Sequence, residues 1–240
     1  LGDSIRTLVV DATVFARAKT AAVIKASRVA AGDAIVGLSN VGQASYEDAS
    51  NSSIGSNGFT LARHALISRK YLKKYPEIFD AAVNDDASYH GRYDLFDTPK
   101  GMTQSIAEAL LSPTRTYLPV IKKVREALGE DLHAAFHCSG GGQTKAVRFG
   151  ARMHYIKNNL FPCPPIFEEI QACLDVPWRE MYSVFNMGHR MEVVCPPRHV
   201  QAVMGLARAF AIDARQVGYV AASAAEGNRV TIESPHGGFE

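Results

Sequence analysis

The chain of 240 residues has few cysteines, little net charge and no long apolar run. Its four cysteines form no CxxC pair, and a chain of this length can bury a core without disulfide bonds, so we expect reduced thiols. A net charge of +2 is too small for the basic footprint of a nucleic-acid-binding protein. No stretch approaches the roughly 18 apolar residues of a membrane span, and the start does not resemble a signal peptide. The sequence therefore predicts a cytoplasmic protein that binds neither nucleic acid nor membranes.

Several catalytic motifs are also missing. The chain has no GxSxG motif of a serine hydrolase. His133 and His137 stand four residues apart, but Ala134 takes the place of the glutamate of a HExxH metal site, and the segment has the pattern of a strand. Glu180 and Glu192 are not spaced as a local pair of glycosidase carboxylates. Because no histidine lies near two cysteines at zinc-ligand spacing, we predict no metal site in this chain.

What the sequence does contain is an alternation of strands and helices along its length. Helical spacing predicts an apolar stripe from Tyr117 to Leu128 and a helix after Pro197. Ser56 or Asn57 is the predicted N-cap of the first helix, because both side chains can accept a hydrogen bond from its first turn. Such interleaving predicts a layered α/β or α+β domain. The predicted helices are residues 59–66, 145–153, 166–174 and 178–185. The predicted strands are residues 34–39, 132–138, 190–195, 217–221 and 229–233, the last two forming a hairpin around residues 226–228.

The most informative segment is the glycine turn, defined here as residues 137–142. An apolar strand ends there in Ser139, Gly140, Gly141 and Gly142, and a helix is expected just beyond. Glycine has no Cβ atom, so successive N–H groups can converge on an anion, and a helix N-terminus adds positive potential. This is the chemistry of a phosphate cradle, although the GK[ST] of a P-loop is absent. A tight strand-to-helix turn without any ligand explains the same residues.

Other polar side chains stand at turns and suggest a shared ligand cleft with the glycine turn. The planar guanidinium of Arg115 suits phosphate, but an arginine at the start of a helix is more often solvent-exposed or paired with a nearby carboxylate. His137 serves either in acid–base chemistry or as a histidine bonded to the backbone. His189 follows a glycine, and we expect it to be accessible. The turns concerned are residues 56–58, 112–115 and 186–190.

Five motifs occur in order along the chain: GDAIVGL (residues 32–38), SNGFTLAR (56–63), SPTRTY (112–117), HCSGGG (137–142) and EMYSVFNMG (180–188). They resemble, in the same order, a GD-apolar strand, SNG[FY]S-x-x-R, APTR-x-Y, H-x-TGGG and EMYRTFN-x-G. These patterns are those of the carboxy-terminal half of the aminoimidazole ribonucleotide synthetase family, also called phosphoribosylformylglycinamidine cyclo-ligase. The resemblance implies an α+β fold, a layered α/β domain with a mixed sheet.

The chain departs from the family pattern at a few positions. Gly55 stands where the family often has histidine, directly before the Ser-Asn-Gly motif. His189 and Arg190 stand where family members commonly have a second glycine. A polar insertion, residues 43–54, precedes Gly55. These differences indicate a divergent subgroup.

The resemblance implies a role in purine biosynthesis, the conversion of formylglycinamidine ribonucleotide to aminoimidazole ribonucleotide. In the family reaction ATP phosphorylates the formyl-amide oxygen, the amidine nitrogen attacks the activated carbon, and phosphate leaves. By motif position, the resemblance implies catalytic roles for His137 and His189. It implies contacts to substrate or phosphate from Ser56, Asn57, Thr114, Arg115, Ser139, Gly140, Gly141, Gly142 and Asn186.

ATP and magnesium are bound in this family mainly by an amino-terminal domain. The resemblance implies that residues 1–30 are the last strand (8–15) and linker of that domain, and that residues 31–240 form the carboxy-terminal domain. We expect homodimers of the full-length protein and an inactive chain on its own. The alternatives are another ATP-using member of the superfamily, of the selenophosphate synthetase or thiamine-monophosphate kinase type, or a non-catalytic ligand-binding domain.

Overall fold

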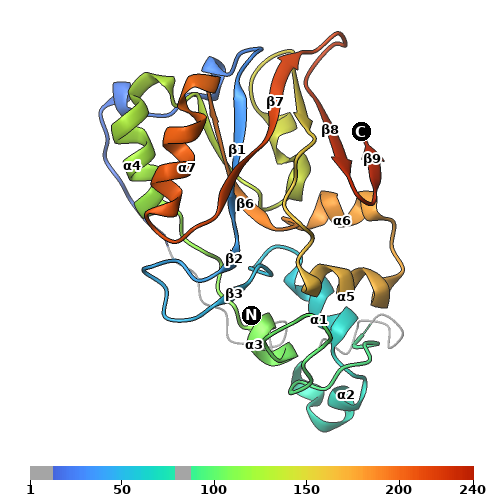
Figure 1. Ribbon diagram of the computed structural model, residues 1–240. Helices are drawn as coiled ribbons and strands as arrows, with labels where there is room; N and C mark the ends of the chain where they lie inside the picture. Colours follow the sequence, from blue (N-terminus) through green and yellow to red (C-terminus); the bar gives the residue numbers. More distant parts are fainter. Residues whose placement is uncertain (1–12, 79–87) are drawn as a thin grey trace.

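Both faces of strand β1 (Ala34–Ser39) are covered, since all six of its residues are buried. The structure is a computed structural model and describes residues 13–78 and 88–240 (Figure 1). A short separate ladder pairs β2 (Val41–Gly42) with β3 (Asn51–Ser52). The remaining strands are β4 (Ala134–His137), β5 (Met153–Lys157), β6 (His189–Cys195), β7 (Ala214–Ala222), β8 (Arg229–Ser234) and β9 (Gly237–Phe239).

The main sheet has seven strands in the order β4-β6-β1-β7-β5-β8-β9. Neighbouring strands are antiparallel except β5 and β8, which run parallel. The sheet is therefore mixed, and the predicted α+β fold is confirmed. The four cysteines are all free, as expected. No helix in the two described ranges has the length and apolarity that crossing a membrane requires.

Helices cover both faces of this sheet (Figure 1). The α-helices are α1 (Phe59–Leu66), α2 (Lys70–Lys74), α3 (Ile106–Leu110), α4 (Leu118–Leu128), α5 (Pro165–Leu174), α6 (Trp178–Val184) and α7 (Val200–Arg208). The short 3-10 helices are η1 (Thr20–Ala22), η2 (Ala26–Arg28), η3 (Pro76–Ile78), η5 (Gly129–Asp131), η6 (Gly142–Arg148) and η7 (Pro197–His199). Helices α4 and α7 contact each other on one face.

Alternate side chains of β1 enter two separate cores. Val36 and Leu38 belong to the core beneath α4 and α7, together with Val120 and Val124 of α4. Ile35 belongs to the opposite core, which α1, α5 and α6 cover. Burying one aliphatic side chain of this size contributes about 1.5–3 kcal/mol. The two cores therefore hold the sheet between two helical layers. The predicted stripe is confirmed, because Tyr117, Val120, Val124 and Leu128 are buried.

The hairpin predicted around residues 226–228 is wrong. Strand β5 lies between β7 and β8, so these two strands are not neighbours. The helix predicted at residues 145–153 is also wrong in type and extent: η6 ends at Arg148, and Met153 begins β5. Gly218 allows β5 to approach β7, since a Cβ atom there would lie 1.9 Å from the carbonyl oxygen of Ile156. The other predicted strands and helices are present, with ends shifted by at most a few residues.

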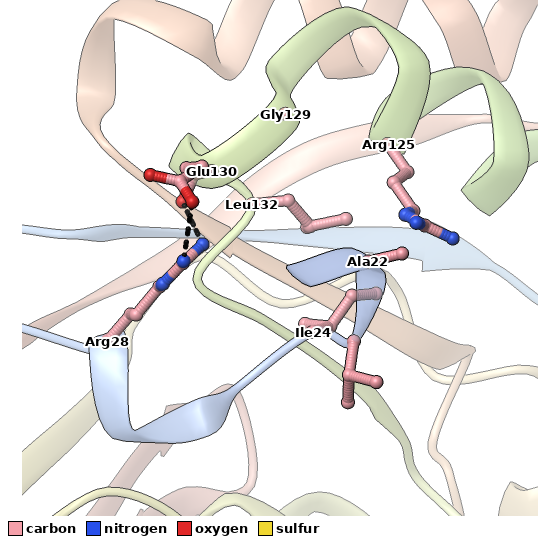
Figure 2. Close-up of a pocket in the computed structure, with 8 residues that line it drawn as sticks. Ala22, Ile24, Arg28, Arg125, Gly129, Glu130 and Leu132 are labelled. Carbon is pink, nitrogen blue, oxygen red and sulfur yellow. Dashed lines mark hydrogen bonds and ion pairs between the residues drawn. The ribbon is translucent and has the colours of Figure 1, made fainter. Parts of the chain in front are cut away.

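The amino-terminal segment lies against the start of β4. Residues 8–12 of the strand expected at 8–15 lie outside the described residues, and residues 13–15 belong to no strand. Ala22 and Ile24 line a pocket of about 200 Å³ together with Leu132 (Figure 2). Arg28 and Glu130 also line this pocket, and Arg28 Nη2 donates to Glu130 Oε1 at 2.9 Å. Leu132 precedes β4 and the glycine turn follows it, so this pocket is at the opposite end of the strand from the turn.

Candidate functional site

The polar turns that were predicted to share a site come together beyond the end of β1. Asn186 is buried, and its Oδ1 accepts a hydrogen bond of 2.8 Å from Ser53 Oγ while its Nδ2 donates to the Ser53 carbonyl at 2.7 Å. The Ser56 N–H donates to Thr114 Oγ1 at 3.0 Å. Asn186 thus fixes one loop against another. The loop cluster, as named below, consists of residues 53–58, 112–115, 137–142 and 186–190.

The glycine turn joins the loop cluster through the main chain. The Cys138 N–H donates to the Arg190 carbonyl at 2.6 Å. The Gly142 N–H donates to the Ser139 carbonyl at 2.9 Å, so this amide is occupied within the turn. A Cβ atom at Gly142 would lie 2.5 Å from the carbonyl oxygen of Phe185. Gly142 therefore serves close packing, and its amide is not part of an anion site.

Gly140 and Gly141 are placed differently. Gly140 is exposed, and nothing lies within 4 Å of the position that its Cβ would take. Gly141 has φ of +106°, a conformation that favours glycine. Within the described part of the chain, neither N–H donates a hydrogen bond. Two of the three amides of the predicted cradle therefore have no acceptor among the described residues.

Ser56 and Asn57 do not cap α1, contrary to the prediction. The N-cap is Gly58, whose φ of +73° starts the helix without a side-chain hydrogen bond. Asn57 instead donates from Nδ2 to the Val184 carbonyl, which ties the loop to α6. Ser56 Oγ accepts from Thr114 Oγ1 at 3.2 Å, and both residues are exposed. The hydroxyl pair, as we call Ser56 and Thr114, thus lies at the surface of the loop cluster.

Arg115 does not point a free guanidinium at this surface. Its Nε and Nη2 form a bidentate pair with the Glu47 carboxylate at 2.8 and 2.7 Å. Nη1 donates to the carbonyls of Ser39 and Val41, and Nη2 to that of Gly42. All five N–H groups have acceptors. The structure therefore favours the alternative of an ion pair with a carboxylate and leaves no Arg115 donor for phosphate.

His189 is fully buried, so the prediction that it is accessible is wrong. It begins β6, and its ring packs against Phe161 at a centroid distance of 5.6 Å. His189 Nε2 lies 2.9 Å from Glu192 Oε1, and Nε2 carries the proton because a carboxylate only accepts. The Lys157 ammonium lies 2.5 Å from the same oxygen. Burial lowers the pKa of His189, so this ring stays neutral and anchors the start of β6.

A third potential metal ligand, Cys138, stands beside this pair. The ligand atoms of Cys138, His189 and Glu192 lie within 4.8 Å of one another. The Lys157 ammonium binds the same carboxylate and also donates to the Gln143 carbonyl at 2.5 Å. A fixed ammonium opposes a second cation there, and burial keeps the Cys138 thiol protonated by raising its pKa. We assign this group to the packing of the fold.

His137, at the end of β4, is half-buried and faces the edge of Tyr117 at a centroid distance of 6.4 Å. Burial lowers the pKa of His137, and the charges of Arg190 and Lys145 lower it further. The imidazole is therefore neutral at neutral pH and has a nitrogen that can accept a proton. Of the two histidines selected from the sequence, His137 is the one with access to solvent.

Arg190 is the functional candidate that sequence reasoning did not select. In the pairing of β1 with β6, Leu38 faces Met191 and Ser39 faces His189, which leaves Arg190 as the extra residue of a β-bulge. Bulges redirect side chains and occur often next to active sites. The Arg190 side chain is fully buried in the loop cluster.

The guanidinium of Arg190 is poorly compensated. Nη2 donates to the Ile54 carbonyl at 2.9 Å and Nη1 to Thr114 Oγ1 at 3.3 Å, while Nε has no partner. Among the described residues, no ion pair includes Arg190. A buried charge without an opposite charge costs about several kcal/mol. In the sequence, Arg190 stood out only as a departure from the family pattern. The structure connects it with Gly55, because a Cβ atom at residue 55 would lie 2.3 Å from the Arg190 guanidinium carbon.

Comparisons with known proteins agree with the five motifs. Phosphoribosylformylglycinamidine cyclo-ligase of Methanocaldococcus jannaschii is 32% identical over 232 residues, which cover 96% of this chain and 57% of the relative. The enzyme of the same name from Methanococcus vannielii is 31% identical over 209 residues, 87% of this chain and 50% of the relative. The chain spans about half the length of the curated relatives it matches.

Solved structures were compared as well. Hydrogenase maturation protein HypE matches with a TM-score of 0.46 and 16% identity over 90% of this chain and 54% of that one. T. maritima PurL complexed with FGAR matches with a TM-score of 0.46 and 14% identity over 92% of this chain and 28% of that one. The family model for AIR synthase related protein, C-terminal domain, matches residues 30–230, a span that contains all five motifs. The chain belongs to this AIR synthase related family and carries its C-terminal domain.

Proposed function

We propose that the chain is the carboxy-terminal part of an ATP-dependent ligase that converts formylglycinamidine ribonucleotide to aminoimidazole ribonucleotide. The names of the relatives support this reaction, because proteins named phosphoribosylformylglycinamidine cyclo-ligase match most of the chain. The observation that carries the proposal is the meeting of four family motifs in the loop cluster. The cluster presents two main-chain amides that have no acceptor among the described residues and the Ser56 hydroxyl, which are donors suited to a phosphate group.

The ring closure requires an activated oxygen and two ends held together. Phosphorylation of the formyl-amide oxygen makes a good leaving group, and the amidine nitrogen then attacks the activated carbon. Holding both ends in one orientation lowers the entropic part of the barrier. We place a phosphate of the substrate at Gly140, Gly141 and the hydroxyl pair, and His137 as the base that accepts the proton lost by the attacking nitrogen. Ser139, Asn57, Asn186 and His189 keep these groups in place.

The proposed division of the protein assigns ATP and magnesium elsewhere. Magnesium takes oxygen ligands, whereas the group of Cys138, His189 and Glu192 offers sulfur, nitrogen and an oxygen already bound by Lys157. That group does not fit Mg²⁺. We therefore assign ATP and Mg²⁺ mainly to a domain that precedes this one, with residues 1–30 as its last strand and linker and residues 31–240 as the present domain. That domain would also form most of a homodimer interface in a cytoplasmic enzyme.

Turnover of the ribonucleotide tests this function. This chain and the natural protein that contains it should each be incubated with ATP and formylglycinamidine ribonucleotide, and aminoimidazole ribonucleotide and phosphate should be measured. We expect formation of both products by the longer protein and none by the chain alone. Thiamine monophosphate serves as the substrate of the alternative class of enzyme. Phosphorylation of thiamine monophosphate would contradict the proposed reaction. Activity of the chain alone would contradict the proposal that a preceding domain is needed for ATP and Mg²⁺.

A further inference from the structure

Three buried side-chain atoms lack a hydrogen-bond partner in the described part of the chain, and all three belong to residues 189–192 at the start of β6. Two of them, on His189 and Glu192, are in side chains whose other polar atoms bind one another. The third is Nε of Arg190, in a side chain that forms no ion pair with a described residue. Buried polar atoms without partners are rare in native proteins and require an explanation. Arg190 is thus a buried cation that the described protein does not balance.

The position of Arg190 links this charge to the surface. Its Nη1 donates to Thr114 Oγ1, and Thr114 Oγ1 donates to Ser56 Oγ. Ser56 and Thr114 are exposed residues, so these hydrogen bonds lead from the buried guanidinium to the surface. The Thr114 hydroxyl gives its one proton to Ser56 Oγ, so the donor of the pair that remains for a ligand is the Ser56 O–H. Hydrogen bonds that start at a cation polarise this donor, which then binds an anion more strongly.

A second cation acts on the same region. The charges of Arg190 and Lys145 both lower the pKa of His137, which places a positive field at the beginning of the glycine turn. Two carboxylates of this region are already paired, Glu47 with Arg115 and Glu192 with Lys157. The field at the loop cluster therefore favours an incoming anion.

The absence of a side chain at Gly55 leaves the space that the Arg190 guanidinium occupies. The space that a side chain at residue 55 would fill is taken by the guanidinium, whose nitrogens lie 2.2 and 2.3 Å from the position of a Cβ atom at Gly55. Gly55 and Arg190 are the two departures from the family pattern that flank this site. The structure shows that they depend on each other, since any side chain at residue 55 would displace the guanidinium.

We propose that Arg190 is a positioning residue for a phosphate group bound by the Ser56 hydroxyl, and that it acts through the Thr114 hydroxyl, which donates to Ser56 Oγ. The ligand class is a phosphate monoester of a sugar. The proposed function is needed only to identify this phosphate as that of the ribonucleotide substrate. Arg190 takes the phosphate-binding role that the sequence had assigned to Arg115, whose donors are occupied.

Calorimetric titration of the full chain tests the proposal. The probes are inorganic phosphate, ribose 5-phosphate, and ribose as the uncharged control. We expect Arg190→Met to weaken the binding of ribose 5-phosphate by about tenfold or more, and Arg190→Lys, which keeps the charge, to weaken it less. Arg208→Met, an exposed arginine on α7, is the matched control and should bind like the wild type. Binding of inorganic phosphate alone would point to a free-phosphate site and overturn the sugar monoester assignment.

A second variant covers the case in which Arg190→Met does not fold. Thr114→Val removes the hydroxyl that links Arg190 to Ser56 with little change of shape, and we expect the same direction of effect. Wild-type affinity in Thr114→Val, or in a folded Arg190→Met, overturns the proposal. These titrations involve no turnover. Arg190-dependent binding without ring closure would therefore leave this inference standing while removing the proposed function, and ring closure without Arg190-dependent binding would do the reverse.

Discussion

The guanidinium carbon of Arg190 lies 2.3 Å from the position that a Cβ atom at Gly55 would occupy. Gly55 has φ of +55°, in the left-handed region that favours glycine. Two positions far apart in the sequence are therefore one packing unit. This relationship makes the buried arginine possible and leads to a direct test.

Substitution of Gly55 should cost more stability while Arg190 is present than after Arg190 has been removed. In the wild type, Gly55→Ala should lower the free energy of unfolding by about 2–4 kcal/mol, because overpacking adds to backbone strain. In an Arg190→Ala background the same change should cost about 1 kcal/mol, from strain alone. Urea unfolding of the four proteins in this cycle gives the coupling. Equal costs in the two backgrounds would show that the residues do not meet.

The Lys157–Glu192 contact should be a strong determinant of stability. Both side chains are fully buried, so Lys157→Met leaves the Glu192 carboxylate without its cation and should cost about 3–5 kcal/mol. Lys123→Met removes an exposed pair with Glu126 and should cost less than about 1 kcal/mol. Thermal and urea unfolding compare the two. Similar small losses would mean that Glu192 finds another partner.

Acid should destabilise the protein partly through Glu192. Burial alone would raise its pKa, but the charge of Lys157 and the hydrogen bond from His189 outweigh burial and lower the pKa to about 2 from its ordinary value of 4.5. The unfolded state then binds more protons in this interval, so stability falls as the pH drops from about 4.5 towards 2, by on the order of 3 kcal/mol. Urea unfolding between about pH 5 and pH 3 should show a flatter profile for Glu192→Gln than for the wild type. The exposed Glu180→Gln variant should keep the wild-type slope, and an unchanged slope in Glu192→Gln would refute the assignment.

Alanine substitutions in the glycine turn should affect stability differently at Gly142, which packs against the protein, and at Gly140, which is exposed. Gly142→Ala brings a Cβ atom to 2.5 Å from the Phe185 carbonyl oxygen at a φ of +47°, and should destabilise the fold by about 2 kcal/mol or more. Gly140→Ala meets open space and should change the midpoint of thermal unfolding little. Differential scanning calorimetry distinguishes the two variants. A large loss in Gly140→Ala would indicate that this residue is needed for the turn itself.

Local patterns predicted much of the fold because they are set by near neighbours in sequence. The buried run of β1, the apolar stripe of α4 and the proline that precedes α7 each follow from the residues of one segment. The insertion of β5 between β7 and β8 was not predictable in this way, because it depends on pairing between distant segments and on the close approach at Gly218. The motifs did predict which loops meet.

The roles of single charged residues were harder to predict. Arg115 and Arg190 both follow polar turns, and no local pattern reveals that Glu47 neutralises the first while the second has no carboxylate among the described residues. His189 looked accessible because it follows a glycine, but the strand that begins there turns its ring into the core. Burial and partner choice are properties of the assembled structure.

Binding of formylglycinamidine ribonucleotide to the longer protein that we propose contains this chain, compared with binding of the same compound lacking its phosphate, tests the central claim most directly. If the loop cluster binds a phosphate of the substrate, calorimetry should show that the ribonucleotide binds at least about 100-fold more tightly than the nucleoside. Equal affinities for the two compounds would contradict a phosphate site in this domain.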